Sequence, residues 1–301
     1  MFSKALVATD LSPASLAVVG CVGGLRALGT SQCVLVHCFD IRQVVTFPQQ
    51  IKEYIEGTLG KQKDILQKQG FAATVQAVPG LPQIEVPRVA EKEGCSLIVV
   101  GSHGYNLGSE ILLGGVASAV IHRASMPVLI LRLTTADNGQ PVCVAGKCDF
   151  LDHVLFPTDF SDNAERAFAY VESVVKSGAR RVTLLHVQDK ARLGKHLEHR
   201  LEEFNEIDRA RLERLKQQLE EDGATDVRIE LPYGAPTAEI LERARQGRAG
   251  LVVMGSHGRG FISEMFLGSV SHNVARHAEA PLLLVPMLGK GNEGSQAPNS
   301  A

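Results

Sequence analysis

Two glycine-rich segments carry the residue types most suited to chemistry in this 301-residue chain. Residues 101–116 read GSHGYNLGSEILLGGV and residues 255–270 read GSHGRGFISEMFLGSV, with nine of the sixteen aligned positions identical. Each segment follows an apolar run and precedes a helical pattern. Glycines at such a turn let backbone N–H groups approach an anion, and the N-terminus of the next helix attracts it further. The segments therefore predict phosphate binding once in each half of the chain.

The second segment holds the fuller set of hydrogen-bond donors. Gly255 and Gly258 would let the backbone pass close to a phosphate, because neither residue carries a Cβ. Gly268 and Ser269 begin the following helix, where free N–H groups and the serine hydroxyl can donate hydrogen bonds. The same spacing also fits two helix-capping turns that bind nothing, so the motif alone leaves both interpretations open.

Asp159 adds an acidic group near the same place. It follows a short apolar run at 153–157, and ligands of open α/β sheets bind where the carboxyl ends of the strands meet. A carboxylate there can accept hydrogen bonds from ribose hydroxyls. Asp159 and Ser161 also suit a turn and N-cap for the next helix, and one residue can serve both roles.

An internal repeat supplies the elements that must position these groups. KALVATDLSPAS at 4–15 matches HVLFPTDFSDNA at 153–164, and short apolar runs alternate with helical periods in each half. Strands too apolar to alternate imply a parallel sheet covered on both faces. We therefore predict an α/β fold of two tandem open parallel-sheet sandwiches of the Rossmann-like type. The second half is expected to have strands at 153–157, 182–187, 227–231, 251–254 and 282–285, and helices at 162–176, 197–221, 235–245 and 268–278.

The repeat divides the chain into two domains, 1–133 and 151–287. Residues 134–150 are rich in Gly, Asp, Thr and Pro, which is typical of a linker, and residues 288–301 lack periodicity, which predicts a disordered tail. The last strand of each domain is apolar and begins with a proline. Pairing these two strands would hide both sheet edges and make one chain an internal pseudo-dimer; a homodimer of chains is also compatible with the sequence.

Composition excludes several classes of partner. The net charge is −2 and 21% of residues are charged, so no basic field is expected to recruit nucleic acid. No apolar run approaches the roughly 20 residues that span a bilayer. The N-terminus is a poor signal peptide, and six cysteines without paired-framework spacing indicate free thiols in a reducing compartment. The sequence predicts a cytoplasmic protein without nucleic-acid or membrane partners.

The spacing between Gly255 and Ser269, GxxG followed by nine residues and GS, resembles the ATP-binding signature of the universal stress protein family. PTD at 157–159 and LHV at 185–187 resemble that family's other hallmarks, and the two copies are similar to its tandem members. The resemblance implies that Asp159 approaches the adenosine end and that the Val187 backbone holds the adenine edge. It also implies that phosphates, with a divalent metal, are held by Gly255, Gly258, Gly268 and Ser269. The implied cofactor is ATP, or AMP or ADP, with Mg²⁺.

Carried onto the first copy, the resemblance implies a second site formed by Asp10, Cys38, Gly101, Gly104, Gly114 and Gly115. Gly115 lacks the hydroxyl of Ser269, Tyr105 replaces Arg259, and Cys38 replaces Val187. One lost neutral hydrogen bond costs about 0.5–1.5 kcal/mol, or at most roughly tenfold in affinity. The second copy is therefore predicted to be the stronger site.

Three functions remain open at this stage. The leading one is a nucleotide-binding regulatory protein of the stress response with little or no hydrolysis, in which ATP stabilises one conformation or interface. The second is an enzyme that slowly hydrolyses ATP or transfers a phosphoryl or adenylyl group. Neither loop reads GxxxxGK[ST], and no general base is repeated beside the phosphates, which argues against an enzyme. The third is a nucleotide-free scaffold, against which the intact Gly268-Ser269 pair argues.

Several reactive residue types have simpler interpretations. His103 and His257 are expected to cap turns or face the other domain, while His37 and His186 are expected to pack with a satisfied ring nitrogen. Cys143 and Cys148 could bind a metal or switch redox state, but no second ligand pair accompanies them. No catalytic or metal-ligating residue is predicted.

Overall fold

The computed structural model describes residues 1–40, 42, 48–102, 113–144, 149–191, 201–258 and 267–287. Leucine- and β-branched-rich runs form the strands, as such side chains pack well on a pleated surface. The strands are β1 Lys4–Thr9, β2 Gln32–Phe39, β3 Ala72–Pro79, β4 Leu97–Gly101, β5 Val128–Leu131, β6 Leu133–Thr135, β7 Pro141–Cys143, β8 Val154–Pro157, β9 Arg181–Leu185, β10 Gln188–Asp189, β11 Asp226–Glu230, β12 Tyr233–Gly234, β13 Leu251–Gly255 and β14 Leu282–Val285. The helices are α1 Pro13–Cys21, η1 Val22–Arg26, α3 Pro48–Lys68, α4 Pro82–Lys92, α5 Gly115–Arg123, α6 Asp162–Lys176, α8 Leu201–Glu221, α9 Pro236–Gln246 and α10 Ser269–His277.

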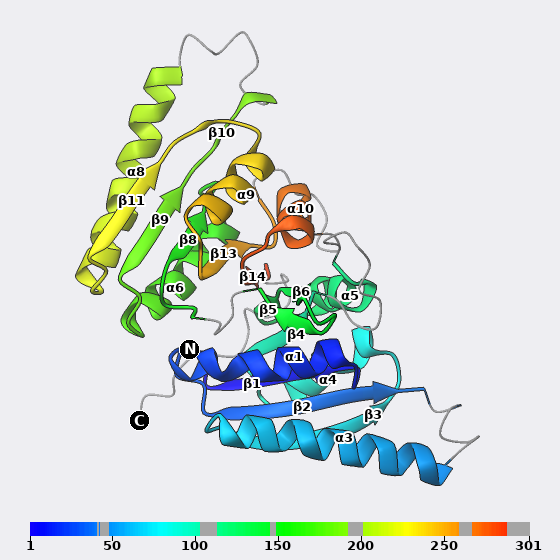
Figure 1. Cartoon of the computed structure of the whole chain (residues 1–301). Coiled ribbons are helices and arrows are strands. Elements are labelled where there is room, and N and C mark those ends of the chain that lie inside the picture. Colours follow the sequence, from blue (N-terminus) through cyan, green and yellow to red (C-terminus); the bar gives the residue numbers. More distant parts are fainter. Residues whose placement is uncertain are drawn as a thin grey trace, which may run out of the picture.

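One ten-stranded sheet runs through both halves of the chain in the order β11-β9-β8-β13-β14-β5-β4-β1-β2-β3 (Figure 1). Neighbouring strands within each half are parallel. At the centre β14 and β5 pair antiparallel, with Leu283 opposite Leu129. The predicted pairing of the two last strands is thus present. The predicted α/β class with tandem parallel sheets is confirmed.

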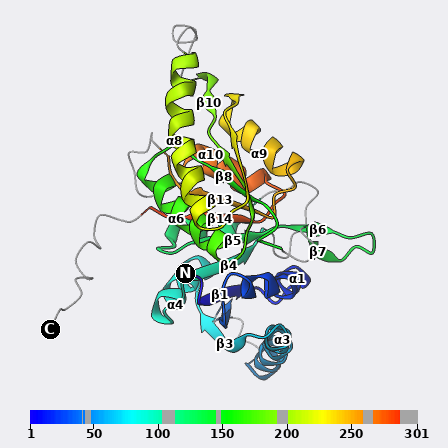
Figure 2. The same ribbon diagram turned by 90° about the vertical axis from the view of Figure 1, so that its left-hand side faces the viewer.

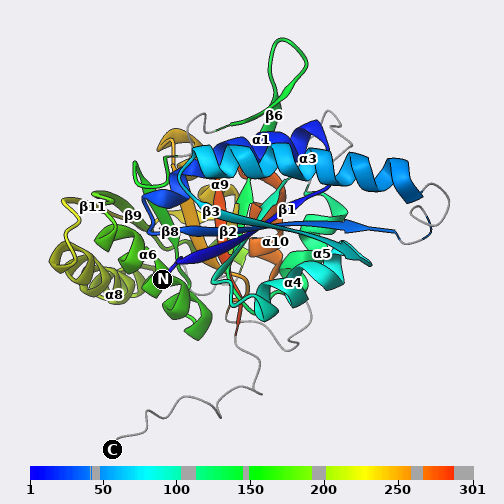
Figure 3. The ribbon, with the colours of Figure 1, turned by 90° about the horizontal axis from the view of Figure 1, so that it is seen from below.

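Helices cover both faces of the sheet, as Figure 3 shows from below. Alternate strand residues point to opposite faces, so the buried side chains divide into two apolar clusters. One cluster packs the sheet against α1, α3, α6 and α8, and the other packs it against α4, α5, α9 and α10. Each half is therefore a three-layer sandwich, and both cores continue across the β5–β14 pairing.

Most predicted elements of the second half are present with small shifts at their ends. Helix α6 and strand β14 have the predicted bounds. Strand β9 ends at Leu185 rather than at residue 187, because the chain leaves the main sheet and Gln188 pairs with Tyr233 in the small β10–β12 sheet. The first residues of the helix predicted over 197–221 lie outside the described part, where α8 begins at Leu201.

The segment predicted as a linker contains a β-hairpin. Strands β6 and β7 pair antiparallel, with Leu133 opposite Cys143. The turn carries Asn138 and Gly139, a pair that favours tight hairpins, and Gly139 has a φ of 77°. The hairpin lies along α1 and projects from the body of the molecule (Figures 2 and 3). This local turn signal was present in the sequence and was missed.

No helix in the described ranges is long and apolar enough to cross a membrane. The predicted tail, 288–301, lies outside those ranges.

Candidate functional site

The site lies where the order of strands reverses. In the second half β8 has β9 on one side and β13 on the other, so their connections leave in opposite directions. Such a switch point opens a crevice outside the carboxyl ends of the strands. Residues that follow β8, β9 and β13 all reach this edge.

A cavity of about 500 Å³ occupies this crevice. That volume lies within the range typical of small-molecule pockets. The structure brings together, in the lining of this one cavity, all the site residues predicted for the second half: Asp159, Val187, Gly255, Gly258, Gly268 and Ser269. The phosphate motif, the acidic residue and the strand end, which are far apart in sequence, thus face one space.

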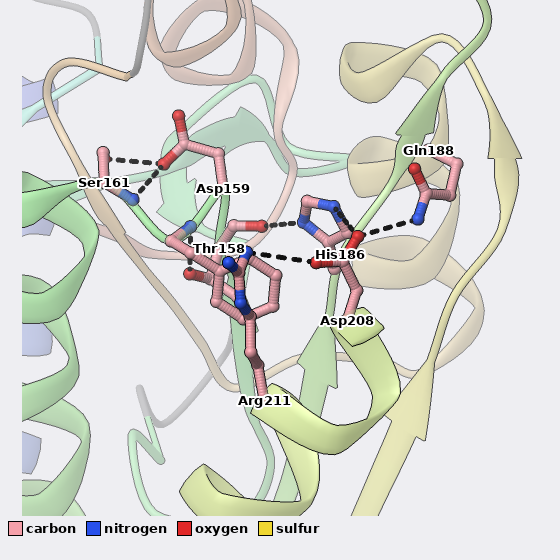
Figure 4. A network of polar contacts seen from close by, with 8 residues as sticks. Thr158, Asp159, Ser161, His186, Gln188, Asp208 and Arg211 are labelled. Atoms are coloured by element: carbon pink, nitrogen blue, oxygen red, sulfur yellow. Dashed lines mark hydrogen bonds and ion pairs between the residues drawn. The ribbon is translucent and has the colours of Figure 1, made fainter. Parts of the chain in front are cut away.

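Asp159 is fixed by the turn that starts α6 (Figure 4). Its Oδ1 accepts hydrogen bonds from the Ser161 backbone N, at 3.1 Å, and from Ser161 Oγ, at 2.6 Å. Ser161 Oγ in turn accepts from Ala164 N and caps the helix. The predicted turn-and-cap role is therefore confirmed, and it leaves Asp159 in the cavity wall.

Two glycines are needed here for close approach rather than for an unusual backbone conformation. A Cβ at Gly258 would lie 2.5 Å from Asp159 Oδ2. A Cβ at Gly255 would lie 2.7 Å from Asn163 Oδ1 and 3.1 Å from the Asn163 backbone carbon. Side chains at these positions would push the loop away from β8 and α6.

Asn163, which is not among the predicted site residues, holds the start of the glycine loop in place. The amide is buried, with 3% of the residue exposed. Its Oδ1 accepts from His257 N at 2.9 Å, and its Nδ2 donates to Val285 O at 3.2 Å. The corresponding residue in the first copy is Ala14. This difference between the two aligned copies was the available signal.

Among the described residues, no side chain caps the N-terminus of α10. Gly268 occupies the N-cap position, with a φ of −57° and a ψ of 146°. Gly268 N donates to Ser256 O at 2.9 Å, and Ser271 Oγ donates to Gly255 O at 2.9 Å. The helix start is thus anchored to β13 while its first N–H groups remain available to an anion, unlike those of the serine-capped α6.

A polar network fixes the neighbouring strand end (Figure 4). His186 Nδ1 lies 2.7 Å from Thr158 O, which joins the ends of β9 and β8. Its Nε2 lies 3.4 Å from Asp208 Oδ2 on α8. Asp208 also accepts from Gln188 Nε2 at 2.9 Å and from Arg211 at 3.3 Å. The prediction that a ring nitrogen of His186 is satisfied is confirmed. Asp208, which contacts the other ring nitrogen, was not predicted.

An aromatic stack completes that network. The Phe160 ring centroid lies 5.2 Å from the Arg211 guanidinium and 4.7 Å from the centroid of the His186 ring, which is tilted by 38°. Phe160 has a φ of 57°, as does its first-half counterpart Leu11 at 64°. Residues other than glycine rarely adopt a positive φ, so the surrounding packing must hold both turns in this conformation.

The first copy repeats part of this arrangement. Asp10 Oδ1 accepts from Ser12 N at 3.0 Å, and Ser12 caps α1. His37 Nδ1 lies 3.0 Å from Thr9 O, so its ring nitrogen is also satisfied. Gly101 ends β4, and Gly114 N donates to Ser102 O at 2.8 Å before Gly115 opens α5. Burial, and secondarily the Glu85 charge, raise the pKa of the Cys38 thiol to about 11. The first copy thus keeps the turn at the aspartate and the bonded histidine, but Gly115 lacks the hydroxyl that Ser269 has in the second copy.

Some predicted residues lie outside the described ranges: His103, Gly104, Tyr105, Cys148 and Arg259. His257 is described, and its Nδ1 lies 2.7 Å from Ser256 Oγ within the loop. Cys143 is buried, with its Sγ 3.7 Å from Ala17 O. Among the described residues, no group of three or more His, Cys, Asp or Glu side chains is arranged to hold a metal.

Known proteins resemble one half of this chain or nearly all of it. Universal stress protein MJ0577 of Methanocaldococcus jannaschii is 33% identical over 150 residues, which are 44% of this chain and 93% of that protein. A universal stress protein of Mycolicibacterium smegmatis is 30% identical over 197 residues. The match covers 64% of this chain and 62% of that protein. A crystal structure of a universal stress protein from Archaeoglobus fulgidus covers 95% of this chain and 99% of its own, with a TM-score of 0.74 and 24% identity, and supports the fold.

The family model for the universal stress protein family matches residues 1–132 and again residues 151–286. These two matches take in both glycine motifs and both leading aspartates. The chain belongs to the universal stress protein family and carries two copies of its domain.

Proposed function

We propose that the cavity of the second half binds an adenine nucleotide, ATP or else ADP or AMP, together with Mg²⁺. The chain then acts in the cytoplasm as a nucleotide-responsive regulatory protein of the stress response. One observation carries this proposal: the residues predicted from separate motifs line a single cavity of about 500 Å³ at the switch point of the sheet.

The phosphate end of the cavity has the chemistry that an anion requires. Helix α10 presents an N-terminus that no described side chain caps, and Ser269 lines the cavity beside it. Gly258 lets the backbone lie against Asp159 without a side chain between them. Backbone N–H groups and the positive end of a helix together favour phosphate oxygens. Gly255, Gly258, Gly268 and Ser269 would hold the phosphates.

The opposite end suits the nucleoside. Asp159 presents a carboxylate that can accept from ribose hydroxyls, and the Val187 backbone can contact the edge of the base. His186, the residue before Val187, contacts the carbonyl of Thr158, the residue before Asp159. The groups proposed for ribose and base are therefore held in a fixed relation before a ligand arrives.

The proposed metal would arrive with the nucleotide. Mg²⁺ usually keeps several waters and binds through phosphates plus one or two protein oxygens, so a dedicated cage is not needed. Ser269 lines the cavity, and its hydroxyl would supply one such oxygen. The metal would neutralise phosphate charge and orient the chain of phosphates along the loop.

We propose at most slow hydrolysis, because neither glycine loop carries the lysine of a GxxxxGK[ST] motif. Catalysis of phosphoryl transfer depends on positioned cations and on an oriented nucleophile. Purified protein should turn ATP over in minutes to hours at most. A steady-state turnover of roughly 1–10³ per second would instead make the chain an ATPase.

Isothermal titration calorimetry with Mg-ATP tests the binding proposal. One strong site per chain is expected, with a weaker second site in the first half. Nucleotide extracted from freshly purified protein and quantified per chain gives an independent count. No heat at millimolar Mg-ATP, combined with no extracted nucleotide, would overturn the proposal.

A further inference from the structure

A buried arginine from the first half reaches into the second. Arg132 follows β5 and is only 2% exposed. Its NH2 donates to the backbone carbonyl of Ala275 and lies 3.4 Å from that of Val274. Both carbonyls belong to the last turns of α10, across the β5–β14 pairing. The first half thus places a cation at the C-terminal end of a second-half helix.

Among the described residues, no carboxylate balances the charge of Arg132, since none of the ion pairs includes it. Within the same part of the chain, its Nε and NH1 have no hydrogen-bond partner. Burial lowers the pKa of the guanidinium to about 10, so the group remains charged at pH 7. Burying a charge without a counter-ion costs free energy. Favourable interaction with the carbonyl end of a helix offsets part of that cost.

The other end of the same helix is the proposed phosphate site. Helix α10 has nine residues, with Gly268 and Ser269 at its start. From Ser269 to Ala275 the rise is about 9 Å. A cation at the C-terminus and an anion at the N-terminus both interact favourably with the helix dipole. Because Arg132 is buried, salt screens its charge much less than it screens a surface charge.

The first half contacts the second-half helix through Arg132, but the second half has no equivalent arginine at the matching position. Aligning β5 with β14 places Pro286 at the position of Arg132. Proline has neither a charged side chain nor a backbone N–H, so the second half cannot return the contact from this position. The half with the fuller phosphate motif therefore receives the arginine, and the half with Gly115 supplies it.

We propose that Arg132 is a positioning residue for the nucleotide site of the other half. It holds a positive charge against the C-terminal carbonyls of α10 and so favours an anion at the N-terminus of that helix. The first half serves as a supporting subunit of the second-half site, beyond any ligand it binds itself. This inference rests on the proposed nucleotide binding.

The test compares Arg132→Met with Arg123→Met in the full-length chain. Arg123 is an exposed residue on α5, so its replacement removes the same charge from the surface. Calorimetry with Mg-ATP should give about tenfold weaker binding at the strong site for Arg132→Met and unchanged binding for Arg123→Met. The deficit should persist from 50 to 500 mM salt, since the charge is buried.

Two further measurements separate positioning from general stability. The thermal unfolding midpoint of nucleotide-free Arg132→Met should stay within about 4 °C of the parent, because removing a poorly paired buried charge is often tolerated. In the parent, Mg-ATP should slow amide exchange at Ala278, whose N–H bonds to Val274 O, and this protection should shrink in the variant. Arg132→Lys, which retains the charge, should bind within about threefold of the parent.

The outcomes are distinct. Equal affinity of parent and Arg132→Met would overturn the inference and leave the proposed site intact. Absence of binding by the parent would overturn both. If Arg132→Met unfolds, the lysine variant decides: retained affinity and Ala278 protection support the inference, and their loss in a folded lysine variant overturns it.

Discussion

The two halves hold their leading aspartates alike but differ behind the glycine loop. Asp10 and Asp159 each accept from a serine that caps the next helix. His37 and His186 each bond to the carbonyl of the threonine before that aspartate. Hence the frame proposed for the nucleoside end is common to both copies.

The phosphate end is where the copies diverge. Asn163, which ties the loop to α6 and β14 in the second half, corresponds to Ala14 in the first. Ser269 corresponds to Gly115. The copies also differ behind the nucleoside end: when the two 21-residue helices α3 and α8 are aligned end to end, Asp208, which contacts His186, falls opposite Ile55. The second half has therefore kept or gained polar groups that fix the site, while the first has apolar or smaller residues there.

The largest expected effect comes from closing the phosphate end. A Cβ at Gly268 would already lie 3.3 Å from Ser256 O and 3.7 Å from Gly258 N, so the branches of valine would fill the loop. Gly268→Val should weaken Mg-ATP binding at the strong site by at least about 100-fold, the scale of a lost anchoring contact. Calorimetry measures this. The matched Gly114→Val change in the first half should leave binding at the strong site unaffected. If both variants lose the same affinity at the strong site, that site is assigned to the wrong half.

Asn163→Ala gives the second half the residue of the first. His257 N–H and Val285 C=O would lose their side-chain partner, at a cost of about 1–3 kcal/mol in the free energy of unfolding. The loosened loop should also bind Mg-ATP about tenfold less tightly. Urea unfolding and calorimetry measure the two effects, with exposed Glu165→Ala on the same helix as the control. Unchanged affinity would show that Asn163 stabilises the fold without positioning the loop.

Exchanging the residue that opens the helix tests both halves at once. Ser269→Gly should weaken the strong site by about two- to tenfold, the value of one hydrogen bond. Gly115→Ser should strengthen the weak site by a similar factor, because no described atom lies within 4 Å of a Cβ at Gly115. Gly115→Ala is the control: it raises helix propensity as serine does but adds no hydroxyl, so it separates the two contributions to affinity. If the alanine and serine variants bind equally well, the hydroxyl is not a ligand contact.

The smallest expected change in affinity is for Asp208→Asn. The amide keeps the shape and can still accept from Gln188, but the charge facing His186 and Arg211 is lost. The free energy of unfolding should fall by about 1–3 kcal/mol, and Mg-ATP affinity by about threefold. Glu206→Gln, an exposed change on the same helix, should alter neither quantity. A loss of binding as large as that of Gly268→Val would place Asp208 in direct contact with the ligand.

The sequence was sufficient for the architecture because its signals were local and repeated. The apolar runs, the helical period of 162–176 and the two glycine segments each predict an element that the structure contains. The six second-half site residues also line one cavity, since parallel strands bring their carboxyl ends to a common edge. Their predicted binding roles stay predictions.

Side chains that act across long distances in sequence could not be found in the same way. Asn163 contacts residues about 90 and 120 positions away, and Arg132 reaches residues about 140 positions away. Asp208 is buried, but it lies on helix α8 among many exposed glutamates and arginines, and its residue type does not distinguish it from them. No local period marks such residues. Only a comparison of the two copies, position by position, sets them apart.

The antiparallel pairing of β5 with β14 also fixes how the two copies can evolve and respond. Both strands belong to one polypeptide, so dilution does not separate them as it would separate two subunits; the tether supplies a constant effective concentration. Each copy always meets the same partner in a one-to-one ratio. Changes in one half can thus be matched by changes in the other, as in a heterodimer whose composition never varies.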